Sequence, residues 1–287
     1  MTWATVARKD FSDAVQSRAL WALVVVFALT SVVSTYGYVE VPEMFGSPGG
    51  ATFDGLILFT VGFTGLFVPL AAIVVCYKAL AGERELGSIK ILLSLPTTRR
   101  DVFVGKVVGR AAVLAFGLGI GLLVGLGVGS ILLRTIELVP LLVFLLLTLV
   151  FAGIYAGIVV SFSATTGSTS RAITLTLGFF VIFELFWDVV PLGILYVVEG
   201  FQLPSTTPGW MYPVMQLSPS AAYFSALVAL LPDLPAAVGG QQSPIPGGSG
   251  TGTEAFYTQP EVGVVILLFW LVVPLVVGYR RFEAADM

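Results

Sequence analysis

The chain has 287 residues, of which 57% are hydrophobic and 11% are charged, and its mean hydropathy is +0.98. Soluble domains carry roughly 25% charged residues, so the composition excludes an ordinary soluble globular protein. The absence of histidine and the single cysteine, Cys76, exclude an intrachain disulfide, zinc chemistry and Ser-His or Cys-His nucleophiles. With a net charge of −3 we expect no nucleic-acid partner. Because histidine, the commonest metal ligand, is missing, we expect no metal, and we expect no cofactor.

Residues 1–18 form the first predicted element. Trp3, Val6 and Phe11 recur at helical spacing against the charged Arg8 and Asp10. This pattern predicts an amphipathic helix on the inner membrane surface, and a frayed basic tail is the alternative.

Six apolar runs follow, each close to the roughly 20 residues that a helix needs to cross a bilayer. We therefore predict an all-α integral membrane protein with six spans, in which the fifth is the least regular. The runs are Ala19–Val39, Leu56–Tyr77, Ala111–Leu133, Leu138–Phe162, Ala172–Val198 and Val262–Tyr279.

The basic residues orient these spans. All 14 lysines and arginines except Arg134 fall before the first span, between spans two and three, between spans four and five, or after the sixth. The positive-inside rule then places both termini in the cytoplasm, as an even number of spans also requires. We expect the plasma membrane of a prokaryote as the location.

The cytoplasmic loop at residues 80–110 is the most informative segment. Apolar residues cluster from Leu86 to Leu95, although a solvated loop needs no apolar face. We predict a short amphipathic helix that docks on another surface. Pro96 ends it, and Thr97 or Thr98 can cap the helix that enters the third span.

The residues of this loop resemble a known family. They are Glu83-Arg84-Glu85, Gly87-Ser88, Leu92-Leu93-Ser94, Pro96, Arg99 and Lys106, placed after two spans and before four. The chain resembles the ABC-2 type permeases, particularly the subgroup linked to multicopper enzyme and nitrous oxide reductase maturation. Ser88 stands where a threonine is more usual.

The resemblance implies that the loop is a coupling element on a separate ABC ATPase subunit. Glu83, Arg84, Glu85 and Gly87 would face that partner, and Arg99 would anchor the loop to the partner or to phosphates of membrane lipids. The alternative is a helix that lies on the lipid surface. The resemblance also implies pairing with a second permease, as a homodimer or with a similar chain, through spans two and five.

An ATPase within this chain is excluded by its sequence. A phosphate-binding loop needs G-x-x-x-x-G-K-[ST], but Gly105-Lys106 is followed by Val107 and lacks the first glycine. We therefore expect no enzymatic activity in this chain, and ATP hydrolysis on another polypeptide.

Four glycines recur every four residues in the third span. Gly117, Gly121, Gly125 and Gly129 predict close helix packing, because small residues let helix backbones approach within lipid. The alternative is a flexible element used during transport.

Two carboxylates interrupt the fifth span. Glu184 and Asp188 lie one helical turn apart, and intramembrane charges are candidates for a substrate path. The alternative is that the helix breaks here and both residues face water at the outer rim.

The longest outer segment spans residues 199–261. It contains a short apolar stretch at Ala221–Leu231 and a Gly- and Ser-rich flexible linker at 239–253. The resemblance implies re-entrant helices in this segment.

We interpret residues 1–287 as one permease domain of an ABC exporter with an undetermined substrate. The alternative is a non-transporting membrane scaffold or sensor for assembly of a respiratory or copper enzyme. Secondary transport is a third possibility, but inverted repeats and midplane coupling charges are not evident.

Overall fold

A computed structural model describes residues 2–44, 51–89, 97–187, 189–198, 200–201, 211–234, 259 and 261–285. Within these ranges the chain is helical and has no strand. The all-α membrane fold is thereby confirmed. The helices are α1 (Trp3–Val15), α2 (Arg18–Met44), α3 (Phe53–Cys76), α4 (Ala81–Glu85), α6 (Arg99–Leu133), α7 (Leu138–Thr165), α8 (Thr169–Phe180), the π-helix η1 (Val181–Leu185), α9 (Val189–Val198), α10 (Met211–Met215), α11 (Pro219–Leu230) and α12 (Val262–Glu283).

Five stretches of the described chain are long and apolar enough to cross a membrane, and a sixth is formed if α8, η1 and α9 together make one span. That sixth candidate is bent by 63° after η1. The irregularity expected for the fifth span is therefore a helix break. The other five candidates are Leu20–Glu40, Phe53–Glu85, Arg99–Leu133, Leu138–Thr165 and Val262–Glu283.

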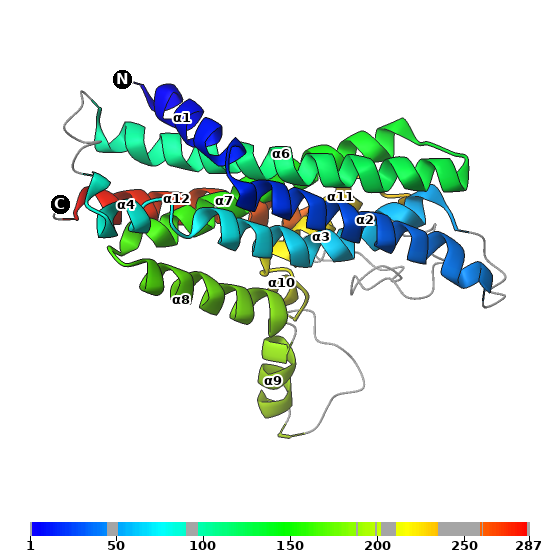
Figure 1. The fold of residues 1–287 in the computed structure, drawn as a ribbon. Helices are drawn as coiled ribbons and strands as arrows, with labels where there is room; N and C mark the ends of the chain where they lie inside the picture. The colour runs from blue at the N-terminus through cyan, green and yellow to red at the C-terminus, as the bar shows by residue number, and fades with distance from the viewer. Residues whose placement is uncertain are drawn as a thin grey trace.

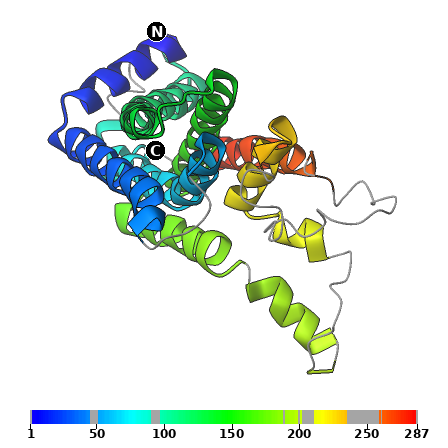
Figure 2. The same ribbon diagram turned by 90° about the vertical axis from the view of Figure 1, so that its right-hand side faces the viewer.

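The long helices α2, α3, α6, α7 and α12 form one bundle, with α8 along its side and α9 pointing away from it (Figures 1 and 2). α1 crosses α6 at the end of the bundle where α4 and both chain termini lie (Figure 1). The outward face of α2 carries exposed apolar side chains such as Leu29 and Val33, as expected for a helix against lipid.

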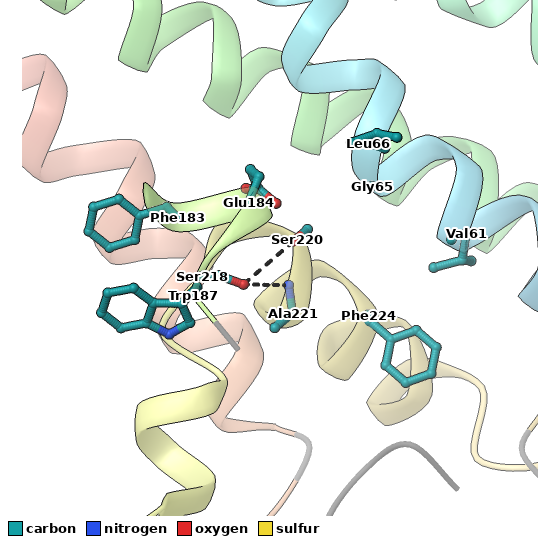
Figure 3. A pocket seen from close by; sticks show the side chains of 11 residues that line it. Val61, Gly65, Leu66, Phe183, Glu184, Trp187, Ser218, Ser220, Ala221 and Phe224 are labelled. Atoms are coloured by element: carbon teal, nitrogen blue, oxygen red, sulfur yellow. Dashed lines mark hydrogen bonds between the residues drawn. The ribbon is translucent and has the colours of Figure 1, made fainter. Parts of the chain in front are cut away.

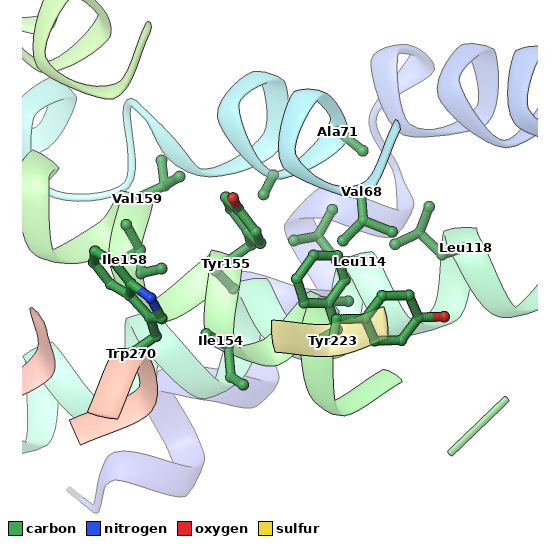
Figure 4. Close-up of a cluster of buried hydrophobic side chains, with 14 of the residues drawn as sticks. Val68, Ala71, Leu114, Leu118, Ile154, Tyr155, Ile158, Val159, Tyr223 and Trp270 are labelled. Atoms are coloured by element: carbon green, nitrogen blue, oxygen red, sulfur yellow. The ribbon is translucent and has the colours of Figure 1, made fainter. Parts of the chain in front are cut away.

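The core lies where α3, α6, α7, α11 and α12 meet. Figure 4 shows Val68, Leu114, Tyr155, Tyr223 and Trp270 converging from these five helices. Tyr223 of α11 is fully buried, stacks on Phe151 and shares a 2.7 Å hydrogen bond with Thr148. Since α11 has only 12 residues, it cannot cross a bilayer, yet it supplies a central core residue.

Glycines on α6 determine how closely α2 approaches. A Cβ atom on Gly121 would lie 2.1 Å from Cδ1 of Phe27, and one on Gly125 would lie 1.9 Å from Oγ of Ser31. Gly117 and Gly129 also lie on the face of α6 that meets α2, because their Cβ atoms would contact Val24 and Thr35 respectively. The four evenly spaced glycines thus line one helix interface.

Candidate functional site

The junction of α1, α4 and α6 contains a buried group of charges. Gly105 and Gly109 let α1 cross α6 closely, since a Cβ on Gly105 would lie 2.8 Å from the carbonyl oxygen of Trp3. Asp10 of α1 is 5% exposed, and its Oδ1 accepts a 2.8 Å hydrogen bond from Nζ of Lys106. Nε of Arg110 lies 2.9 Å from Oδ2 of the same carboxylate.

Glu83 connects α4 to this group. Its Oε1 lies 2.5 Å from Nζ of Lys106, so one ammonium bridges a carboxylate of α1 and a carboxylate of α4. The two acidic and two basic side chains of this group balance one another in charge. Removing one of them would leave an uncompensated charge away from water, which is costly. We name Asp10, Glu83, Lys106 and Arg110 the charged junction.

The next two residues of α4 bind the ends of two other helices. Arg84 donates from Nη1 to the carbonyls of Ala164 and Thr166 at 3.1 and 3.2 Å, where α7 ends. Oε2 of Glu85 accepts the backbone N–H of Thr169 at 2.8 Å, where α8 begins. Both contacts satisfy backbone groups that a helix end leaves without an intrahelical partner, and both suit the helix dipole.

A side chain from α7, Ser163, binds the backbone at the start of α4. The hydroxyl of Ser163 accepts the backbone N–H groups of Leu80 and Ala81 at 3.1 and 2.9 Å, and donates to the carbonyl of Tyr77. Glu83, Arg84 and Glu85, which we expected to face a partner, therefore also join α4 to α6, α7 and α8.

The chain turns outward directly after α4. Leu86 is 84% exposed, and Gly87 has a φ of +71° with no atom within 4 Å of an added Cβ. Glycine suits this left-handed conformation because it has no side chain. Most of the predicted amphipathic helix, from residue 90 to its end, lies outside the described residues.

Arg99 lies at the start of α6 and contacts the carboxyl-terminal end of α12. Its Nη1 donates to the carbonyls of Glu283 and Ala285 at 2.5 and 2.9 Å, where α12 ends. Thr98 caps α6 together with Asp101, and Asp101 also accepts the N–H of Trp3 at 3.1 Å. Arg99 and Asp101 thus fix the two terminal helices at this end of the bundle.

A separate cavity of about 330 Å³ lies between α3, η1 and the start of α11 (Figure 3). Glu184 is the one charged side chain among its described lining residues, and the hydroxyls of Ser218 and Ser220 border the same space. The phenol of Tyr155 donates a hydrogen bond to Oε1 of Glu184. The lining is otherwise apolar or aromatic and includes Val61, Gly65, Leu66, Phe183, Trp187 and Phe224.

The helix geometry places Glu184 at this cavity. η1 is a π-helix, whose backbone bond runs from the N–H of Phe186 to the carbonyl of Val181. Such wide turns are found frequently at functional sites. The rings of Phe183 and Trp187 stack with 4.7 Å between centroids, and Trp270 meets Phe183 edge to face. Asp188, the second predicted path residue, lies outside the described residues.

Sequence reasoning missed two features of these sites. The pairing of Asp10 with Lys106 and Arg110 was not predicted, although Gly105-Lys106 and Gly109-Arg110 repeat at four-residue spacing and indicate a face for a crossing helix. No sequence signal marks Tyr155, which is one tyrosine within a long apolar span.

The fold and these sites define a polytopic helical membrane protein with a charged junction at one end and a cavity beside a broken helix. The model of the ABC-2 family transporter proteins matches residues 4–287, and the chain therefore belongs to that family. It is a permease subunit of an ABC transporter, and the family implies an ABC ATPase partner. The family resemblance seen in the cytoplasmic loop is confirmed.

Two relatives carry the name "Probable ABC transporter permease protein NosY". The protein of Stutzerimonas stutzeri is 26% identical over 223 residues, which cover 76% of this chain and 78% of the relative. The protein of Pseudomonas aeruginosa is 27% identical over 245 residues, which cover 80% of this chain and 87% of the relative. These relatives match the subgroup that the loop motif indicated.

Proposed function

We propose that this chain forms the membrane path of an ABC exporter and that a separate ATPase docks on α4 and the loop that follows it. The observation that carries this proposal is the position of α4. Within five residues it contacts Lys106 of α6, the end of α7 and the start of α8. A force applied to α4 would therefore reach three helices at once.

The charged junction extends this connection to α1. Lys106 binds both Glu83 of α4 and Asp10 of α1. A displacement of α4 would therefore also move α1, the helix that we place on the inner membrane surface. Rigid-body movement of subunits and small shifts of packed helices are common forms of conformational switching. In this proposal Glu83, Arg84 and Glu85 transmit motion, while the exposed Leu86 and the half-buried Gly87 supply contact surface.

The remaining parts of the proposal follow the charge distribution and the family. Both termini lie in the cytoplasm of a prokaryotic cell, and the chain pairs with itself or with a second permease through the second and fifth spans, Leu56–Tyr77 and Ala172–Val198. Glu184 and Asp188 border the path toward its outer end. The chain has no catalytic role, since ATP is hydrolysed on the partner.

Affinity purification of the tagged chain from its native membrane in mild detergent tests the docking site. We expect a P-loop ATPase to be recovered with the wild type and lost with Leu86→Glu. This variant places a charge on an 84% exposed side chain without touching the charged junction. Ile136→Glu is the matched control, because Ile136 is an exposed aliphatic residue in the α6–α7 loop, which we place on the opposite side.

The double variant Glu83→Ala with Arg84→Ala tests transmission. We expect weaker ATPase recovery or loss of ATPase stimulation, and Arg134→Ala with Glu137→Ala removes one basic and one acidic residue elsewhere as a control. Recovery of the chain alone, or with a redox enzyme and no ATPase, would favour the scaffold function instead.

A further inference from the structure

The cavity between α3, η1 and α11 has a chemistry that restricts what can occupy it. Its volume of about 330 Å³ suits a small organic molecule, since ligand pockets range from roughly 300 to 1,000 Å³. Among the described lining residues Glu184 is the one charged group, and no lysine or arginine is present. The fixed charge offered to an occupant is therefore negative.

The carboxylate is held in a defined position. Tyr155 is buried in α7 and donates its hydroxyl hydrogen to Oε1 of Glu184. This hydrogen bond orients the carboxyl group, which has about four acceptor positions in all. Figure 3 shows Glu184 above Ser218 and Ser220, with α3 across the space.

The start of α11 borders the cavity, and a helix start can attract an anion. Here the first turn supplies few donors. Ser218 accepts the N–H of Ala221 on its hydroxyl at 3.1 Å and the N–H of Ala222 on its carbonyl at 2.9 Å, and Pro219 has no N–H. An anion would therefore meet few N–H groups and would lie beside the carboxyl oxygens of Glu184.

The walls of the cavity favour an apolar body beside the charge. Phe183 and Trp187 stack on one another, and the indole N–H of Trp187 donates to the carbonyl of Val214 at 2.7 Å, so this wall is fixed. Val61 and Leu66 face them from α3 (Figure 3). The α3 wall is open at Gly62, because a Cβ there would meet no atom within 4 Å, whereas a Cβ on Gly65 would lie 3.5 Å from Cβ of Ser220.

We propose that this cavity binds an organic ammonium ion on a compact apolar body, with Glu184 as its counter-charge. This inference rests on the proposed function, because it names the substrate class for the path bordered by Glu184. The ammonium can belong to a free hydrophobic amine or to a lipid headgroup.

Equilibrium binding of labelled benzyltrimethylammonium to the full chain in phosphatidylglycerol nanodiscs tests this proposal. We expect saturable binding that neopentylbenzene, in which carbon replaces the charged nitrogen, does not displace. Glu184→Gln should weaken binding by about tenfold or more, since an amide keeps the acceptor for Tyr155 but removes the charge. Glu137→Gln, a loss of the same charge outside the cavity, should bind as the wild type does.

A second variant separates loss of the site from loss of the fold. Gly62→Leu keeps Glu184 and extends a side chain into open space, so it should abolish binding while the unfolding midpoint stays near that of the wild type. Gly127→Leu on α6 adds the same side chain at another open position and should leave binding unchanged. Equal binding of the ammonium and its carbon analogue, or unchanged affinity in both Glu184→Gln and Gly62→Leu, would overturn the proposal.

Two further comparisons identify the source of the ammonium and separate a failure of this proposal from a failure of the proposed transporter function. Phosphatidylethanolamine added to the nanodiscs should compete if a lipid headgroup is the ligand, and should not compete if the ligand is a free amine. If the ATPase is recovered but the ammonium does not bind, the ammonium proposal fails and the permease function stands. If the ammonium binds and no ATPase is recovered, the cavity stands and the transporter proposal fails.

Discussion

The charged junction and the cavity treat charge in opposite ways. At the junction two carboxylates from α1 and α4 meet two cations from α6, so the charges are matched within the chain. In the cavity a single carboxylate is oriented by a phenol, and the described lining carries no cation. In our proposals, the first region holds helices together and the second binds an occupant.

The largest effect on stability should come from the junction. Asp10→Ala leaves Arg110 without its carboxylate and Lys106 with one partner, and we expect a loss of about 3 kcal/mol, because removing one member of a buried ion pair leaves an uncompensated charge. Chemical unfolding in detergent measures this loss. Asp13→Ala, at an exposed position of the same helix, should have almost no effect, and equal losses in both variants would show that the junction contributes no special stability.

Helix packing should give the next effect. Gly121→Ala forces a methyl group against Phe27, and overpacking of this kind costs about 1–3 kcal/mol. Gly127→Ala lies six residues along on an open face and should be neutral or stabilising by up to about 1 kcal/mol, since alanine favours helix. Equal unfolding curves for the two variants would contradict the close approach of α2 to α6.

Loss of the single hydroxyl of Ser163, which holds the start of α4, should measurably lower the stability of the fold. Ser163→Ala removes the acceptor of two buried N–H groups, and we expect a loss of about 1–2 kcal/mol together with faster hydrogen exchange at Leu80 and Ala81. Ser161→Ala is the control, because that hydroxyl binds only a carbonyl within its own helix. Unchanged exchange at Leu80 would show that α4 is held by its charged side chains alone.

The smallest effect should be local to the carboxyl end of the chain. Arg99→Ala removes donors from the last carbonyls of α12, and we expect about 0.5–1 kcal/mol of fraying, visible as faster hydrogen exchange in the last turn. Arg100→Ala removes the same charge from an exposed neighbour and should leave exchange in α12 unchanged.

The helices, the glycine-lined face of α6 and the family could be predicted because they depend on patterns local to one segment. The apolar runs, the four-residue spacing of the glycines and the motif that begins at Glu83 each lie within one short stretch of sequence. The junction and the cavity could not be predicted, because they depend on helices separated by many residues. Asp10 and Lys106, for example, are 96 positions apart, and Tyr155 and Glu184 are 29 apart.

The π-helix η1, which precedes the break, is a place where a change of one residue in chain length would alter the local helix geometry. π-helical turns occur mostly as single-turn bulges inside α-helices, where they add one residue to a turn. Deletion of one codon within Val181–Leu185 would then restore a regular α-helical turn, and the later residues of the segment would keep their faces, because the wide turn takes up the extra residue. The position of Glu184, and whether the segment bends, would then depend on a single insertion or deletion in the gene.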